Sequence, residues 1–531
     1  MAERRRAVPP TVLPQSDPRA DDGGSRPSPE DHHTRLTSAR VLARSTVWNL
    51  IGQGAPALIA VPAIPILVHA LGIDRFGVLS IAWMLVGYFS LFDLGLGRAL
   101  TQLVAVRLGT SDERAVPAIA WTALALMLAL GCVGALAAGL ASPWLVRSAL
   151  IIPVPLQAET LHSFYLLAAS IPVVITTAGL AGILEATQRF AIINAIRLPL
   201  GVFTYLGPLL VLPFSTSMFW VTGVLLLARL LALGVHFVVC LRVIPALGAG
   251  VVLNRAAVGP LFRFGGWMTA SNIVNPLMVY LDRFLIGSVV SVSAVAYYCV
   301  PFDAVAKTAI VPAALVGVLF PAFATSLTGD RSRARALFDR GVTYIFLALF
   351  PLTLVAVTLS HEILELWLGA AFARTSGPVL RWVALGFFAN GLAQVAFALL
   401  QGAGRADLTG RLHIVELPFY LGTLWWLLST RGIEGAALAF FLRMTLDVLL
   451  LFALAWRIVA AESATVRKSL VAMAVVVVVL SLATLPGTTI LRALYLAVTL
   501  PAFGLWAWFR LLTPTEKGRI RSWANFSRRG G

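Results

Sequence analysis

The chain has 531 residues, of which 59% are hydrophobic and only 12% are charged, and its mean hydropathy is +0.87. A soluble protein of this size needs far more polar surface, so these values are typical of a polytopic membrane protein. The formal net charge of +17 is no nucleic-acid signal. The basic residues lie in short segments between apolar runs, where they act as membrane topology signals. Composition therefore excludes a soluble enzyme and a nucleic-acid-binding domain.

Both ends of the chain are polar and basic. Residues 1–40 are rich in Arg, Pro, Asp, Ser and Gly and hold no apolar run, which predicts a disordered basic tail. The stretch lacks the apolar core of a signal peptide, so we expect no cleavage for secretion. Residues 512–531 form a second basic tail.

Between the tails the sequence predicts about fourteen transmembrane helices, because each apolar run is near the ~20 residues that span a bilayer. Their approximate limits are 45–70, 77–103, 116–142, 160–185, 190–213, 217–241, 264–288, 294–324, 340–361, 378–402, 409–430, 435–457, 468–486 and 490–511. The eighth is longer than a bilayer needs, and we expect it to extend past the membrane or to bend at its prolines.

The distribution of Arg and Lys predicts the orientation. Sixteen such residues lie in the connections that follow even-numbered segments, and six lie in the connections on the opposite side. By the positive-inside rule, both termini are then cytoplasmic, which suits an even number of helices. We expect a multi-pass protein of the bacterial cytoplasmic (inner) membrane.

Two landmarks recur at one spacing and indicate an internal repeat. Trp48 and Trp267 are 219 residues apart, and so are the prolines of Leu198-Pro199 and Leu417-Pro418. The repeat predicts two pseudo-symmetric six-helix lobes, with substrate sites at their interface. The expected organisation is a tail over 1–40, lobes over 41–245 and 260–460, two additional helices over 465–511, and a tail over 512–531.

The hairpin expected over residues 263–307 carries the most informative polar residues. On its first helix, four residues fall on one stripe: Trp267, Ser271, Asn275 and Asp282, the last followed by Arg283. On its second helix, Asp303 and Lys307 lie well inside the hydrophobic run. Charges inside a membrane are costly, so they usually face a cavity or a partner and mark a pathway. Asp282 and Arg283 near the outward end also fit an interfacial pair.

Other intramembrane charges leave two readings open. Asp303 and Lys307, and likewise Arg443 and Asp447, are spaced to neutralise each other on one helix face or to bind substrate.

Arg98 follows Asp93 at a spacing that does not pair them, and it either lines a cavity or reaches the cytoplasmic face. Arg229 has no acidic neighbour one turn away, so its partner lies on another helix or on the substrate. Glu416 is a lone intramembrane carboxylate and a candidate for coupling to a proton or sodium gradient. The cysteines and histidines show no metal-ligand spacing, and we expect no metal and no other cofactor.

Several segments resemble the polysaccharide (O-antigen type) flippase family of the multidrug/oligosaccharidyl-lipid/polysaccharide exporter superfamily. They are residues 49–81, FDLGLGRAL (92–100), LDRFLIGSVVSVSAVAYYCVPFD (281–303) and LQGAGRADLTGRLHIVELPFYL (400–421). The resemblance implies a transporter, not an enzyme, that moves an undecaprenyl-diphosphate-linked oligosaccharide to the outer leaflet by alternating access. It also implies other polysaccharide-assembly membrane proteins as partners. The diphosphate would favour a cavity presenting Arg.

The candidate site residues follow from these readings. For substrate binding they are Arg98, Arg229, Asn275, Arg283, Lys307 and Arg443, and for coupling or charge pairing they are Asp93, Asp282, Asp303, Glu416 and Asp447.

The alternatives are a lipid II flippase or a cation-coupled multidrug antiporter of the same superfamily. From other classes, a membrane polymerase or glycosyltransferase would show a large outward loop or a DxD-type motif, which this chain lacks, and an assembly subunit would not need intramembrane charges.

Overall fold

The computed structural model describes residues 39–89, 95–110, 113–256, 258–259, 281–329, 331–459, 476, 478–483 and 487–518. The chain divides into a short unit, residues 1–49, and a large unit, residues 50–531, to which all contacts below belong. The described residues are largely helical and include no β-strand, which confirms the all-α class. Ten of their helices are long and apolar enough to cross a membrane.

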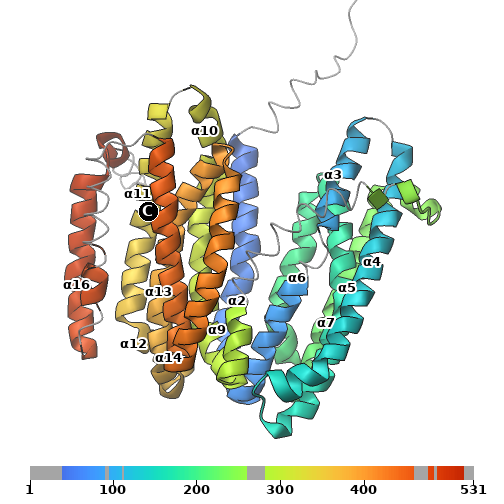
Figure 1. Cartoon of the computed structure of the whole chain (residues 1–531), viewed down its shortest axis with the longest axis horizontal. Coiled ribbons are helices and arrows are strands. Elements are labelled where there is room, and N and C mark those ends of the chain that lie inside the picture. Colours follow the sequence, from blue (N-terminus) through green and yellow to red (C-terminus); the bar gives the residue numbers. More distant parts are fainter. Residues whose placement is uncertain are drawn as a thin grey trace, which may run out of the picture. The chain divides into compact units, whose positions relative to one another are not determined.

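The first helical group consists of α3 to α7, which pack mainly on one another (Figure 1). Its members are α3 (Leu96–Gly109), α4 (Val116–Trp144), α5 (Val154–Ala186), α6 (Phe190–Val211) and α7 (Met218–Val243). Within this group α5 is central, because it contacts each of the other four helices.

The second helical group consists of α9 to α14. Its members are α9 (Val292–Ala306), α10 (Ile310–Gly329), α11 (Arg331–Thr358), α12 (Ser360–Leu368), α13 (Ala370–Gly402) and α14 (Ala406–Ile458). Helix α13 contacts all the others and is the most buried candidate span, with 72% of its most apolar stretch inside the protein. By contrast α16 (Thr489–Trp506) is 11% buried and lies against α11 at the periphery.

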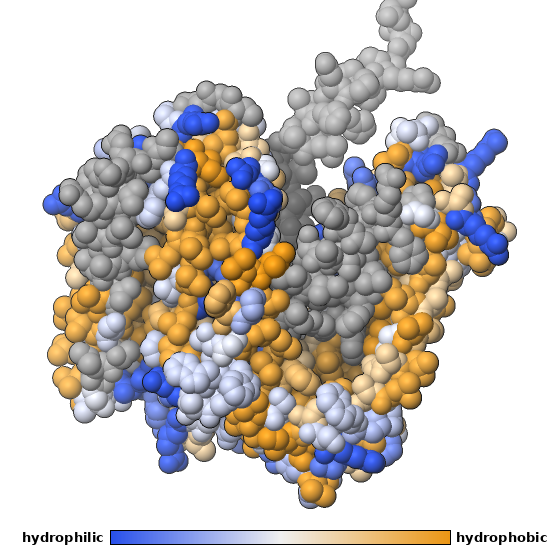
Figure 2. Space-filling view, in the orientation of Figure 1, coloured by the Kyte–Doolittle hydropathy of each residue, from blue (hydrophilic) through white to orange (hydrophobic). Residues whose placement is uncertain are grey.

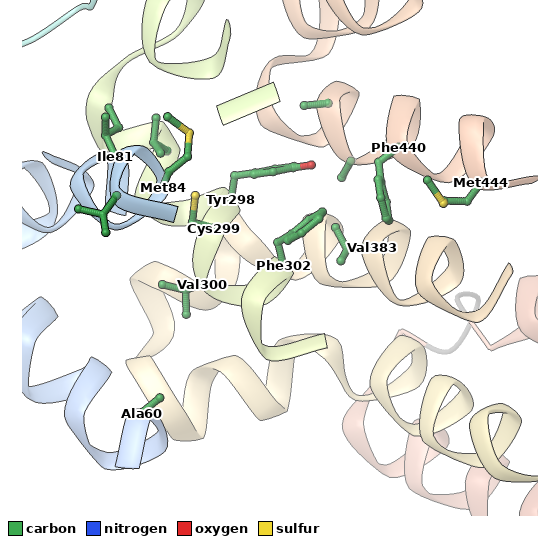
Figure 3. Packing of buried hydrophobic residues seen from close by; sticks show 14 of the residues in the cluster. Ala60, Ile81, Met84, Tyr298, Cys299, Val300, Phe302, Val383, Phe440 and Met444 are labelled. Atoms are coloured by element: carbon green, nitrogen blue, oxygen red, sulfur yellow. The ribbon is translucent and has the colours of Figure 1, made fainter. Parts of the chain in front are cut away.

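Helix α2 (Ala39–Phe89) contacts both groups. The ring of Trp83 lies 5.2 Å from that of Tyr205 on α6, while Trp367 of α12 donates to the carbonyl of Val61 at 2.6 Å. Figure 3 shows Ile81 and Met84 of α2 beside Cys299 of α9.

Two of the ten candidate spans contain a sharp break at a glycine. Gly72 in α2 has φ 76° and ψ 163°, and Gly432 in α14 has φ 59° and ψ −144°. Glycine adopts positive φ readily, so these positions turn the chain between two helices. Both breaks fall between segments that the sequence separates, 45–70 from 77–103 and 409–430 from 435–457. Segments 264–288 and 468–486 lie largely outside the described residues, so the count of fourteen stays a prediction.

Several boundaries differ from the prediction. The helix expected over 77–103 does not run through as one regular helix, because Gly95 adopts a left-handed φ of 70° and α3 starts after it. Helix α11 begins at Arg331, nine residues before the apolar run, and the separate α12 was not anticipated. Hydropathy marks only the part of a helix that is apolar enough for lipid, and helices extend beyond it. The long eighth segment is interrupted by a 3₁₀ turn over Lys307–Ala309.

Small residues let the helices approach closely in the first group. A Cβ placed on Gly131 of α4 would lie 2.5 Å from the Cα of Pro172 on α5, and one on Gly182 would lie 2.9 Å from the carbonyl oxygen of Gly97. Helices in membranes associate through such close packing, because lipid supplies no hydrophobic drive.

The outside of the helices is apolar. Figure 2 shows hydrophobic residues along much of the visible helices and the most hydrophilic residues gathered near their ends. Large apolar side chains are exposed, among them Phe214 at 90% and Leu366 at 92%. Lipid rather than water solvates such a surface, so the structure is that of a multi-pass membrane protein.

Candidate functional site

An ionic network is buried beside α9. Asp282, only 1% exposed, accepts hydrogen bonds from the hydroxyl of Tyr298 at 2.7 Å and from the backbone N–H of Arg283 at 2.7 Å. The Arg283 guanidinium forms an ion pair with Asp303 at 2.5 Å. Helical residues 281–289 and α9 therefore place two carboxylates and one guanidinium together inside the second helical group.

The position of α9 follows from its cap and its packing. Ser291 caps the helix by accepting from the N–H of Ala294 at 3.0 Å. Figure 3 shows α9 between α2 and the rest of the second group, with Val383, Phe440 and Met444 on the side of Phe302. Tyr298 and Phe302 are four residues apart, about one turn, so they share one helix face, and both are buried.

Aromatic rings cover the guanidinium. The Cζ of Arg283 lies 5.3 Å from the ring centre of Phe302, which in turn packs edge-on against Phe387 and Phe440 at 5.2 and 5.1 Å. A cation over an aromatic face is attracted by its quadrupole, most strongly where water is excluded. The rings therefore hold the guanidinium in one place.

The ion pair lies at the border between interior and accessible space. The Arg283 side chain is 7% exposed, whereas that of Asp303 is 42% exposed. Both lie close enough to Tyr205 of α6 to interact with it electrostatically. Tyr205 thus brings the first helical group near the pair.

A second charged cluster lies within α14, because the break at Gly432 folds the two halves of this helix against each other. The Cζ of Arg443 lies 5.0 Å from the ring centre of Tyr420, and both residues are buried. Nε2 of His413 lies 3.6 Å from Oδ1 of Asp447, and Glu416 is close to both. Tyr420 interacts electrostatically with Asp282 and Tyr298, so the two clusters form one network.

The structure corrects two sequence interpretations. Asp303 pairs with Arg283, not with Lys307, which is exposed in the 3₁₀ turn after α9. Arg443 and Asp447 form no ion pair with each other; the imidazole of His413 lies beside Asp447 instead. In both cases the neighbour comes from another helix or from the far half of a folded one, and not from one turn away on the same helix. Asp282 and Arg283 are deeply buried.

The remaining candidates lie apart from the network or outside the described residues. Arg98 is exposed on α3. Arg229 is half-buried on α7 and has no ion-pair partner within the part of the chain that the structure describes. Asn275 and Asp93 lie outside the described residues.

Sequence reasoning missed three members of the network. They are Tyr298, Tyr420 and His413. Tyr and His are common at helix ends, so neither type stands out. For Tyr298 alone the sequence held a usable signal, because Tyr298 and Asp282 are sixteen residues apart on the two helices of the expected hairpin.

The turn before α9 touches the first helical group and α2. The N–H of Ile151 donates to the carbonyl of Gly287 at 2.9 Å, and the N–H of Val292 donates to the carbonyl of Ile151 at 3.1 Å. The Ser293 hydroxyl donates to the Asp74 carboxylate, a pair separated by 219 residues. A Cβ on Gly77 would lie 2.1 Å from the carbonyl oxygen of Val292, so glycine is needed there.

Charges buried among membrane-spanning helices, with one of them partly exposed, are typical of a multi-pass membrane transporter. Solved structures show the same fold. An inward-facing multidrug resistance MATE family transporter of the MOP superfamily aligns with a TM-score of 0.59 at 14% identity, over 78% of this chain and 94% of that one. A MOP superfamily transporter from Pyrococcus furiosus aligns with a TM-score of 0.54 at 14% identity, over 79% and 95%.

Sequence comparison gives the family. Residues 66–377 match the family described as polysaccharide biosynthesis protein. A Shigella flexneri protein named "Putative O-antigen transporter" is 31% identical over 411 residues, 77% of this chain and 96% of that protein. The Escherichia coli K12 "Lipopolysaccharide biosynthesis protein WzxC" is 23% identical over 206 residues, 38% of this chain and 41% of that protein. The chain belongs to the family of these polysaccharide biosynthesis proteins and O-antigen transporters, which confirms the resemblance to the O-antigen type flippase family. It shares its fold with the solved MOP superfamily transporters.

Proposed function

We propose that this protein moves an undecaprenyl-diphosphate-linked oligosaccharide from the cytoplasmic to the outer leaflet of the bacterial inner membrane by alternating access, with both termini cytoplasmic. The family supplies the substrate class, since the similar Shigella flexneri protein carries O-antigen in its name. The chemistry of translocation needs no covalent step. The protein must only bind a charged head group within the membrane and expose it to each side in turn.

The observation that carries the proposal is the Arg283–Asp303 pair. Its guanidinium is buried beneath aromatic rings, while the Asp303 carboxylate reaches accessible space near Tyr205. A diphosphate that displaces Asp303 would offer the same guanidinium more oxygens. The planar fork of Arg can bind two phosphate oxygens at once, which suits this head group. Asp303 would then hold Arg283 in a charge-balanced state between cycles and release it to the substrate.

The contacts at the turn before α9 support a two-lobe exchange. Asp74 and Ser293 are separated by 219 residues, the spacing of the sequence repeat, and they touch each other. Equivalent residues of two repeats meet only near the axis that relates them, so this contact fits two lobes related by an axis along the membrane normal, which could rock against each other around the site. Breaking the contacts of Ile151 with Gly287 and Val292 would open this end.

The test is transbilayer movement of a fluorescent lipid-diphosphate oligosaccharide in proteoliposomes. We expect wild type to move the lipid, and Arg283→Lys, which keeps the charge but loses the planar fork, to be at least ~10-fold slower, since each lost charged hydrogen bond costs about 1.5–3 kcal/mol. Arg443→Ala should also be slow. Arg374→Ala is the matched control, because Arg374 is exposed on α13.

The same assay decides the open candidates. Arg98→Ala, Arg229→Ala and Lys307→Ala should move lipid like wild type if the network alone binds the head group. Equal rates in wild type and Arg283→Lys would refute the site. A wild type that moves no lipid but expels organic cations down an ion gradient would be a multidrug antiporter, and one that moves lipid II alone would belong to cell-wall synthesis.

A further inference from the structure

Three side chains of α14 converge on one point away from the Arg283–Asp303 pair. One potential ligand atom from each of His413, Glu416 and Asp447 lies within 4.8 Å of the other two. His413 and Glu416 are three residues apart on the first half of α14, and Asp447 comes from the second half, beyond the break at Gly432. Glu416 is ten residues into the helix, roughly 15 Å along its axis, so the cluster is deep in the span.

The Glu416 carboxyl group is buried without hydrogen bonds. Its residue is 4% exposed, and among the described residues neither of its oxygens has a hydrogen-bond partner. Oδ1 of Asp447, 7% exposed, also lacks one. Burying an ionised carboxylate costs far more free energy than burying a neutral acid, unless charge and hydrogen bonds compensate. The cluster therefore requires added positive charge.

The charged groups around the cluster determine how much positive charge it requires. Glu416 interacts electrostatically with Asp447, His413 and Arg443. From the first half of α14, Tyr420 also faces the cluster, and beyond it lie Tyr298 of α9 and Asp282. From α13, the ring of Phe397 stacks on His413 at 6.4 Å, and its contribution is uncharged. Among the described residues that act on Glu416, the carboxylates of Glu416 and Asp447 against the guanidinium of Arg443 leave a single negative charge. A monovalent cation balances that charge, and a divalent ion would exceed it.

The donor set favours a proton over a metal ion. Hard cations such as sodium are held by several oxygen ligands, whereas an imidazole and two carboxyl groups are the usual carriers of protons. We propose that Glu416, His413 and Asp447 form a site that holds one exchangeable proton. The site deepens the proposed function, because its role in transport rests on that function, while its proton binding does not.

The network suggests how the proton acts on transport. When the cluster is loaded, Glu416 no longer competes for Arg443, which stays over Tyr420 beside Asp282. When the proton leaves, the ionised Glu416 attracts Arg443 and withdraws it from Tyr420. Proton loading would then set the charge presented to the diphosphate in the same network.

The binding half is tested by infrared difference spectroscopy of the full chain in phosphatidylethanolamine–phosphatidylglycerol nanodiscs, titrated with acid and base in choline chloride. Wild type should show a protonated-carboxyl band that disappears on alkalinisation. Glu416→Gln should lose this band, and Glu416→Asp should keep it at a shifted pH. Glu365→Gln is the matched control, since Glu365 also lies beside a histidine, His361 at 3.4 Å, but is 50% exposed.

Three results would overturn the proton site. The band persists in Glu416→Gln, or sodium chloride removes it from wild type at constant pH, or micromolar zinc chloride does so. Monodisperse elution of each variant, together with the unchanged bands of the remaining carboxyl groups, separates loss of the site from misfolding.

The transport half uses the lipid assay with an imposed pH gradient. We expect wild type to accelerate with the gradient, and Glu416→Gln and His413→Gln to move lipid at the same rate with and without it. If these variants still accelerate, the proton site does not couple and the proposal fails, while the flippase stands. If wild type moves no lipid at all, the proposed function fails, and the infrared band still decides whether the site binds a proton.

Discussion

The two helical groups handle buried polar groups in different ways. In the first group the buried polar side chains are mostly hydroxyls bonded within their own helix; Thr122 donates to the carbonyl of Ala118 at 2.6 Å and Ser170 to that of Leu167 at 2.6 Å. In the second group, taken together with helical residues 281–289 as the second region, the buried side chains include five charged ones: Asp282, Arg283, Glu416, Arg443 and Asp447. Among the described residues, no Asp, Glu, Lys or Arg is fully buried in the first group.

This difference separates scaffold from site. A hydroxyl that bonds its own helix costs little and commits the protein to no partner. Buried charges weaken the fold unless they are paired across helices, so their concentration around α9 and α14 needs a function to explain it. The first group then serves as the wall that faces the network, as Tyr205 does beside Asp303.

The largest expected effect comes from removing one buried acid. Asp282→Ala would leave the Tyr298 hydroxyl without its acceptor and the Arg283 charge less balanced, which should cost about 3–5 kcal/mol of stability. Ser170→Ala in the first group should cost less than ~1 kcal/mol, because its hydroxyl bonds only a carbonyl of its own helix. Thermal unfolding of both variants in one detergent measures the contrast. Equal losses of stability in the two variants would mean that Arg283 and Tyr298 do not depend on Asp282 for charge balance and hydrogen bonding.

Two glycines sharpen the comparison at an intermediate size. Gly131→Ala should cost about 1–3 kcal/mol, because its Cβ would meet the Pro172 backbone. Gly139→Ala, with open space at its Cβ, is the control. Gly386→Ala should lower stability and also slow lipid movement, since its Cβ would lie 2.5 Å from the Phe440 ring that supports Phe302 over Arg283. Lipid movement at the wild-type rate by a folded Gly386→Ala variant would show that these rings do not contribute to the site.

The smallest expected effect lies outside both groups, at Glu516. Its carboxylate accepts from the Tyr344 hydroxyl and, at 2.7 Å, from the N–H of Thr513, and it lies 3.4 Å from Arg340. These contacts, the Tyr344 hydrogen bond first, lower the pKa of Glu516 to about 2. The folded pKa is depressed, so the stabilisation is present above the unfolded pKa of about 4.5 and is lost as the pH falls through about 2.

Glu516→Gln should therefore lower the unfolding free energy by less than ~1 kcal/mol at pH 7, because the group is largely solvated. The difference from wild type should be unchanged at about pH 5 and smaller at about pH 3. Denaturant unfolding at the three pH values measures it. A difference that grows on acidification would contradict the assignment of the contact.

Sequence patterns predicted the elements better than the site. Runs of about twenty apolar residues predicted most of the helices, and the gaps between runs coincide with the breaks at Gly72 and Gly432. Lipid solvation imposes length and composition locally, which is why these features can be read from the sequence. Spacing along one helix failed for Asp303 and for Arg443, whose neighbours come from other helices or from the far half of a folded one. His413 and Tyr298 carried no local signal that distinguished them from interfacial residues.

The sequence by itself determined that this chain crosses the membrane many times, which family it resembles, and that charges lie within its spans. Those properties depend on composition and on residues close together in the chain. Only the tertiary structure decided that Arg283 pairs with Asp303 and that His413, Glu416 and Asp447 meet. Pairing of buried charges depends on distances across helices, which the break at Gly432 and the packing of α9 set.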